Sequence, residues 1–143
     1  MIRHWALLLF LATSWAAPGV AMAVEPGAYR MTYWQTMPHL ERYATPRTLT
    51  LCLETDTIFP VLAGNGAFDQ CEVTDRIQTD THFSYNLVCP GRAGARAQAR
   101  YKIGPDLFRG KIAVKLGAKN MTMIEYQSGE RIGPSDTCAP TGN

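Results

Sequence analysis

Four cysteines lie in or beside segments where apolar and polar residues alternate, and this combination points to a cross-linked β-sheet. Cys71 and Cys89 bound two such segments, which are joined by a turn-forming stretch around Asp80. Folding the chain back at Asp80 sets residues opposite each other in the pairs Ile77/Phe83, Asp75/Tyr85, Val73/Leu87 and Cys71/Cys89. Opposite residues of an antiparallel pair have Cβ atoms within disulfide reach. We therefore predict a Cys71–Cys89 disulfide and, by elimination, a Cys52–Cys138 disulfide.

The first 23 residues are typical of an export signal. Arg3 and His4 precede an apolar run over residues 5–17, and Ala21-Met22-Ala23 is a small-x-small cleavage pattern. We predict cleavage after Ala23, which releases residues 24–143 as one antiparallel β domain in the periplasm or outside the cell. The apolar run is shorter than the about 20 residues of a spanning helix. Residues 24–143 contain no apolar run long enough to span a membrane, so we expect no transmembrane segment there. Paired cysteines agree with an oxidising compartment.

Period-two alternation recurs through residues 24–143 without a long stretch of 3.6-residue periodicity. We predict an all-β fold, an antiparallel meander of about seven strands in which sequential strands pair. It forms a partly closed barrel or a curled sheet, with a sandwich as the open alternative, and has at most one short helical turn, at 55–58. The predicted strands are 29–37, 48–53, 71–77, 83–89, 95–103, 108–116 and 121–127, with Ser128-Gly129 closing the last.

The hairpin over residues 95–116 carries a basic outward face. Its register sets like charges opposite each other in three pairs, Lys102/Arg109, Arg100/Lys111 and Arg96/Lys115. Like charges directly opposite each other destabilise a sheet, yet six of the 13 cations after residue 23 lie on this face. Two interpretations stay open: a solvated, edge-protecting surface, or a face that binds anions. Glu125, on the last strand, is expected beside Lys111 and Lys115, where it neutralises part of the charge.

The inward positions of the same hairpin begin with three small residues, Ala95, Ala97 and Ala99. They leave space for an apolar ligand in the interior. The alternative is that a large ring from Trp34, Phe83 or Phe108 packs on the alanines.

The sequence shows no catalytic signature. His39 and His82 are the only histidines after residue 23, and both are predicted to lie in or beside loops. No serine has a nucleophile-elbow context, and the cysteines lack the C-x-x-C spacing of zinc and redox sites. Four methionines suit the gaps of a β core better than a soft-metal site. We expect no catalytic residue, no metal and no cofactor, and hence no enzyme.

Several short motifs resemble domain of unknown function 3617, a family of small exported proteins of Gram-negative bacteria. The resemblance rests on Pro26-Gly27-Ala28-Tyr29, Cys52-Leu53, Cys71, Cys89, Met121-Thr122-Met123, Ser128-Gly129 and Gly133-Pro134 before Cys138. It covers nearly all of residues 24–143. This chain departs from the family's pattern in having few methionines before the second strand and in inserting Ser135-Asp136-Thr137 before the last cysteine. The resemblance implies export and a β fold, but no activity.

We therefore expect an exported, non-enzymatic binding or interaction module. Its basic face would meet envelope anions, which are anionic lipid, lipopolysaccharide or an acidic envelope protein, and its interior would offer an apolar site. Nucleic acid is not an expected partner in that compartment. The alternatives are a structural or stress-related envelope protein that acts through protein contacts, and an uncharacterised enzyme.

Overall fold

The structure is a computed structural model and describes residues 24–54, 57–62, 66–91, 94–116 and 121–138. The predicted export signal, residues 1–23, lies outside the described residues. The same holds for Thr55 and Asp56, where the predicted helical turn begins, and the described Thr57 and Ile58 are not helical. Helical geometry in the described parts occurs in two 3₁₀ turns, η1 (Glu41–Tyr43) and η3 (Ser135–Thr137).

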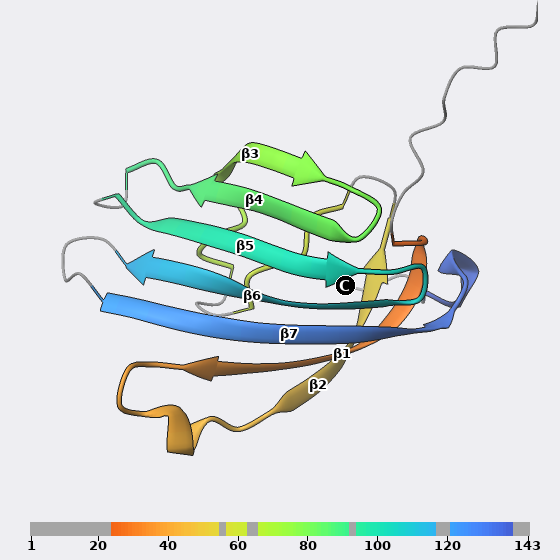
Figure 1. Ribbon diagram of the computed structural model, residues 1–143, viewed down its shortest axis with the longest axis horizontal. Coiled ribbons are helices and arrows are strands. Elements are labelled where there is room, and N and C mark those ends of the chain that lie inside the picture. The colour runs from red at the N-terminus through yellow and green to blue at the C-terminus, as the bar shows by residue number, and fades with distance from the viewer. Residues whose placement is uncertain (1–23, 55–56, 63–65, 92–93, 117–120, 139–143) are drawn as a thin grey trace, which may run out of the picture.

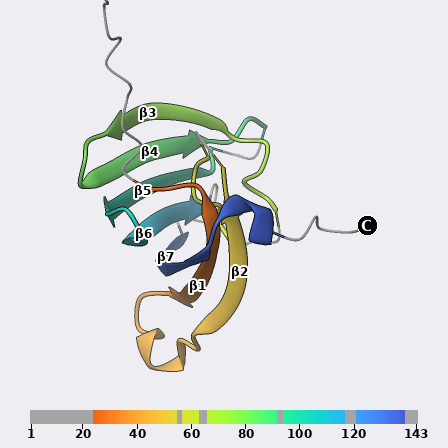
Figure 2. The ribbon, with the colours of Figure 1, turned by 90° about the vertical axis from the view of Figure 1, so that its right-hand side faces the viewer.

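Seven strands form one antiparallel sheet, which confirms the predicted all-β class (Figure 1). They are β1 (Gly27–Thr36), β2 (Arg47–Leu53), β3 (Glu72–Gln78), β4 (His82–Val88), β5 (Arg96–Ile103), β6 (Leu107–Leu116) and β7 (Met121–Gly133). The spatial order is β2-β1-β7-β6-β5-β4-β3, so β2 and β3 are edges that do not pair with each other. The sheet is therefore curled and open, neither a closed barrel nor a sandwich (Figure 2).

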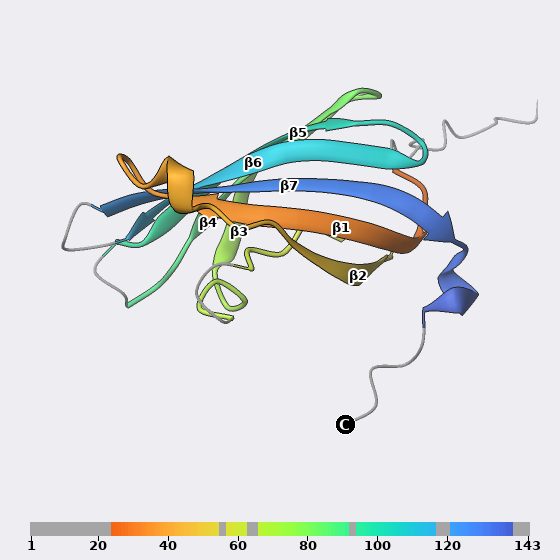
Figure 3. The same ribbon diagram turned by 90° about the horizontal axis from the view of Figure 1, so that it is seen from below.

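The strand order departs from a simple meander at one point. Strands β3 to β7 are neighbours in sequence order, as predicted. Strand β2, however, does not pair with β3; instead, the β1–β2 hairpin joins the sheet through a pairing of β1 with β7. The β2–β3 connection must therefore pass from one edge of the sheet to the other. Its described parts run along the inner, concave face (Figures 2 and 3). We call its described parts, residues 57–62 and 66–71, the strap.

The core lies between the concave face and the strap. Burial alternates residue by residue along the whole of β5, as the sequence pattern predicts. The strap contributes Phe59, whose ring centroid lies 6.0 Å from that of Phe83, 4.3 Å from Tyr101 and 4.1 Å from Phe108. The strap thus supplies the second layer that a one-sided sheet needs in order to bury its apolar face.

Strand β7 continues to Gly133, whereas the sequence predicted an end at Gln127. Gly129 lies inside the strand, opposite Phe108 on β6. A Cβ atom added at Gly129 would lie 2.2 Å from the Phe108 ring, so the ring occupies the space a side chain would take. Glycine in a strand marks such a close approach as well as a strand end. Met123 is buried, so the residues at odd-numbered positions from Met123 onward form the inward face of this strand, which the sequence alternation alone did not determine.

Strands β3 and β4 pair as predicted near the cysteines, with Val73 opposite Leu87. The register then shifts by one residue between Thr74 and Ile77. Asp75 lies in this interval with a φ of 51°, a left-handed conformation that β-bulges use. One extra residue therefore enters β3 without a partner on β4.

The bulge reverses the faces of the residues that follow it. Ile77 lies opposite Ser84 on the outer face and is 63% exposed, so the predicted Ile77/Phe83 pair in the core is wrong. Arg76 is turned to the inner face instead, and its guanidinium lies 5.3 Å from the centroid of the Phe83 ring. A single inserted residue has this effect because side chains alternate with a period of two.

Both predicted disulfides are present. Cys71 and Cys89 are joined with a Cα–Cα distance of 4.2 Å, and Cys52 and Cys138 with 5.8 Å. The turn η3 leads the chain from the end of β7 to Cys138. Each edge of the open sheet therefore carries one covalent link.

Candidate functional site

The six predicted anion-binding residues lie on the outer face of the β5–β6 hairpin, away from the strap. The register pairs them as predicted, in the sets Arg96/Lys115, Arg100/Lys111 and Lys102/Arg109. Their side chains are exposed, whereas most residues between them are buried. Because β6 is the middle strand of seven, the pairs lie along the crest of the convex face, which is the face seen in Figure 1.

The acid of the hairpin turn does not compensate these cations. The Asp106 carboxylate lies 3.7 Å from the guanidinium of Arg131, which also contacts Glu25 at 3.4 Å. Among the described residues, none of the six outer-face cations forms an ion pair. No described acid therefore offsets their positive charge through an ion pair.

Glu125 does not lie beside Lys111 and Lys115, so that expectation is wrong. It faces inward on β7 and is fully buried. One of its carboxylate oxygens accepts a hydrogen bond from the backbone N–H of Leu62 at 3.0 Å and another from the side-chain amide of Gln127. A buried carboxylate needs such donors, and this one holds the strap instead of neutralising the outer face.

Two of the three basic pairs surround an open depression of the outer face. Tyr101 and Gly110, whose side-chain positions point inward, contribute its floor. Around it stand His82, Arg100, Lys102, Arg109, Lys111 and Tyr126. Four basic side chains around a shallow depression suit an anion with several oxygens, such as a phosphate. The third pair lies farther along the same two strands.

A stacked aromatic pair, which the sequence reasoning did not assign to the site, lies beside the depression. The rings of Trp34 and Tyr126 are 5.3 Å apart between centroids and inclined by 15°. Both residues are half-buried on the outer face, so the expectation that Trp34 could fill the interior is wrong. The sequence does contain one indication of this position: Trp34 shares its face of the first predicted strand with polar residues.

The strap packs against the part of the sheet where an apolar internal site was expected. Ala95, Ala97 and Ala99 are buried and belong to one packed cluster with strap residues such as Phe59 and Phe68. The space behind the alanines is therefore filled by the chain itself.

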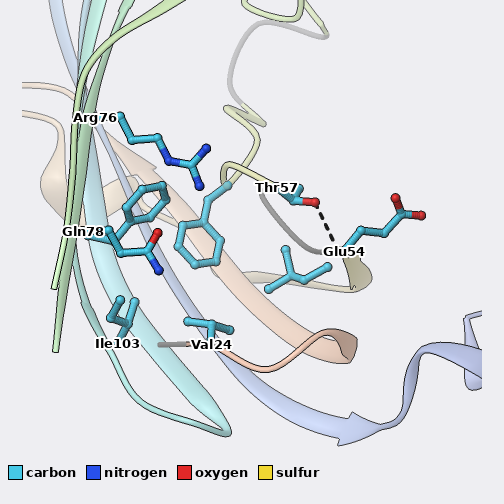
Figure 4. A pocket seen from close by; sticks show the side chains of 9 residues that line it. Val24, Glu54, Thr57, Arg76, Gln78 and Ile103 are labelled. Atoms are coloured by element: carbon cyan, nitrogen blue, oxygen red, sulfur yellow. Dashed lines mark hydrogen bonds between the residues drawn. The ribbon is translucent and has the colours of Figure 1, made fainter. Parts of the chain in front are cut away.

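A small pocket lies at the end of the inner face, where Arg76, turned inward by the bulge, points toward the side of Thr57, while the carboxylate of Glu54 points away from it (Figure 4). Its other walls are Val24, Leu53, Phe59, Gln78, Phe83 and Ile103. The cavity volume of about 20 Å³ holds about one water molecule. Ligand pockets typically measure about 300 Å³ or more, so this pocket does not serve as the expected apolar site.

The two histidines lie in different places. His82 stands at the rim of the depression with Nδ1 2.9 Å from the Thr81 hydroxyl. His39 follows β1 with a φ of 70°, and its backbone N–H donates to the Glu41 carboxylate at 3.2 Å. Neither imidazole contacts a carboxylate within the described parts of the chain. In those parts, no group of three or more His, Cys, Asp or Glu side chains is placed to hold a metal ion.

Together, these features define an open, curled antiparallel sheet with a strap packed on its concave face, one disulfide at each edge and a basic convex face. Comparisons with protein-family models, with curated proteins and with solved structures found no match to this chain. The resemblance to domain of unknown function 3617 stays an expectation. No described helix is long and apolar enough to cross a membrane. The two disulfides are typical of an oxidising compartment outside the cytoplasm.

Proposed function

We propose that the protein is an exported, non-enzymatic module of the bacterial envelope that binds anionic partners through its outer face. The supporting observation is the set of three like-charge pairs on adjacent strands. Each such pair costs the sheet a few tenths to about 1 kcal/mol. The same net charge spread over other outward positions would avoid that cost. A multivalent anion bound between the pairs offsets it.

A protective role fits these residues less well. Charged side chains protect a sheet from aggregation when they lie on edge strands. The six cations lie on β5 and β6, and β6 is the middle strand. The edge strand β3 has its own protection, the bulge at Asp75.

A second candidate function, contact with another protein through a sheet edge, has one observation in its favour. Val73 and Ile77 are exposed apolar residues on the edge strand β3. The bulge between them interrupts the regular backbone pattern that an added strand requires. The outer face is therefore the stronger candidate.

The proposal is tested by binding residues 24–143 to vesicles of neutral lipid with and without an anionic lipid, across a salt series. Binding should require the anionic lipid and weaken as salt rises, because exposed charges are screened. Each Lys or Arg near an anionic membrane contributes about 1 kcal/mol. The double reversal Arg100→Glu/Lys111→Glu should therefore weaken binding by at least about 30-fold.

A matched pair of single variants separates the face from the net charge. Lys111→Gln and Arg76→Gln each remove one positive charge, the first from the outer face and the second from the inner face. Lys111→Gln should weaken vesicle binding about fivefold, and Arg76→Gln should leave it unchanged. Equal effects of both variants, or binding indifferent to salt, would refute the proposal. Thermal unfolding of each variant verifies that it folds.

A further inference from the structure

We infer that the partner of the outer face is a phospholipid bilayer, with Trp34 and Tyr126 entering the headgroup region while the basic pairs bind lipid phosphates. This inference rests on the proposed function and adds to it the partner and the orientation of the molecule on it.

The first argument is a row of four side chains across the outer face. The strand registers place Trp34 opposite Tyr126, Tyr126 opposite Lys111 and Lys111 opposite Arg100. With about 4.8 Å between neighbouring strands, the row is about 14 Å long. Two rings with polar tips thus lie directly beside two cations. Trp and Tyr side chains favour the headgroup level of a bilayer, and Lys and Arg favour its anionic surface.

The second argument is the loop between β1 and β2, which continues the apolar end of this row. Met37, Leu40 and Tyr43 in this loop are 38%, 48% and 64% exposed. Tyr43 and Trp34 line one depression of the surface. Figure 3 shows the loop, with its turn η1, on the side of the sheet away from the strap. Exposed apolar side chains next to cations are the composition of an interfacial membrane-binding surface.

The third argument is shape. The outer face is convex (Figure 2), and a convex surface meets a flat partner along its crest. The crest here consists of the central strands, which hold Lys111, Arg100 and Tyr126. A small soluble anion would use the depression alone and would leave Trp34 and the exposed loop without a role. A bilayer uses all three features.

Trp34 is itself the probe for the test. The chain has three tryptophans, and the other two, Trp5 and Trp15, precede the predicted cleavage point. Residues 24–143 contain both disulfides and all seven strands that the structure describes. Titration with phosphatidylcholine–phosphatidylglycerol vesicles should shift the Trp34 emission to shorter wavelength, and lipids brominated near the headgroup should quench it. Both measurements use the unaltered sequence, so a misfolded variant cannot obscure them.

Two binding measurements, one with vesicles and one with soluble inorganic polyphosphate, separate this inference from the proposed function. Trp34→Ala should weaken vesicle binding at least fivefold and leave binding to inorganic polyphosphate unchanged, whereas Arg100→Glu/Lys111→Glu should weaken both. Ile77→Ala, which removes an exposed apolar side chain from the far edge of the outer face, should change neither. Salt-dependent vesicle binding with unchanged Trp34 emission, or binding of polyphosphate alone, would overturn the bilayer assignment and leave anion binding intact. Binding of neither probe would overturn both.

Discussion

At the scale of single residues, two glycines determine how closely aromatic rings pack on the inner face. A Cβ atom added at Gly129 would lie 2.2 Å from the Phe108 ring, and one at Gly110 would lie 2.3 Å from the Tyr101 ring. Each ring lies across the glycine of the neighbouring strand, an arrangement that supports a curved sheet. The missing side chains are therefore part of the core packing.

Replacing Gly129 with alanine should destabilise the protein by about 1–3 kcal/mol, the usual cost of overpacking a core. Phe108 is buried and its ring packs against the rings of Phe59 and Tyr101, so it cannot shift without disturbing them. Urea unfolding measures the change in the free energy of unfolding. Gly104→Ala is the matched control, because the nearest atom to its added Cβ lies at 3.8 Å, and we expect a change within about 0.5 kcal/mol. Equal losses in both variants would contradict the packing argument.

Single residues also show how far local pattern reaches. The alternation correctly predicts the pairs Arg100/Lys111 and Lys102/Arg109, because a short turn and a regular hairpin leave one register. It fails after Asp75, since the alternation alone does not show that one residue will be left unpaired in a bulge. It also treats Gly129 as a strand end, because the ring that requires a glycine belongs to another strand.

At the scale of elements, the strap is held by side chains of the sheet that bind its backbone. The Tyr85 hydroxyl donates to the Phe59 carbonyl at 2.5 Å, and the Gln127 amide donates to the Pro60 carbonyl at 2.7 Å. Gln127 and Glu125 are polar although they occupy inward strand positions. They form hydrogen bonds with backbone groups of the strap, which is not part of the sheet and does not pair with a strand. The strap lacks periodicity, so sequence pattern could predict a loop there but not its path across the sheet.

The buried tyrosines of the inner face predict a loss of stability in alkali. Burial raises the pKa of Tyr29 to about 12 and raises the pKa of Tyr85 and of Tyr101 well above the ordinary value of 10. Below about pH 10 both states hold these protons, so stability is complete. Above that pH the unfolded chain releases protons that the folded chain keeps, and stability falls by about 1.4 kcal/mol per pH unit for each buried tyrosine.

Urea unfolding between about pH 8 and about pH 11 measures this slope. Above about pH 10, Tyr85→Phe should make the slope shallower by up to about 1.4 kcal/mol per pH unit, because phenylalanine has no proton to release. It should also lower stability at pH 8 by about 1 kcal/mol, since the hydrogen bond to Phe59 is lost. A slope equal to that of the wild type would show that this phenol already ionises in the folded protein.

At the scale of the whole molecule, the sheet joins its first strand to its last. The β1–β7 pairing links segments about 100 residues apart in the chain, with no turn between them to define a register. Sequence pattern therefore predicts the hairpins from β3 to β7 but not the position of β1 and β2. The disulfides could be predicted because the Cys71–Cys89 hairpin is local and leaves one choice for the other two cysteines.

The two disulfides should contribute unequally, because they close loops of different length. Cys52 and Cys138 are 86 residues apart, and Cys71 and Cys89 are 18 apart. The chain-entropy model assigns about 4.6 kcal/mol to the first and about 3.2 kcal/mol to the second. The paired serine variants, compared by urea unfolding, should follow that order. The reverse order would mean that local contacts of the strap beside Cys71 outweigh loop entropy.

Whichever order is found, a disulfide variant that still folds should keep its affinity for anionic vesicles, because the basic pairs lie on central strands that neither disulfide touches.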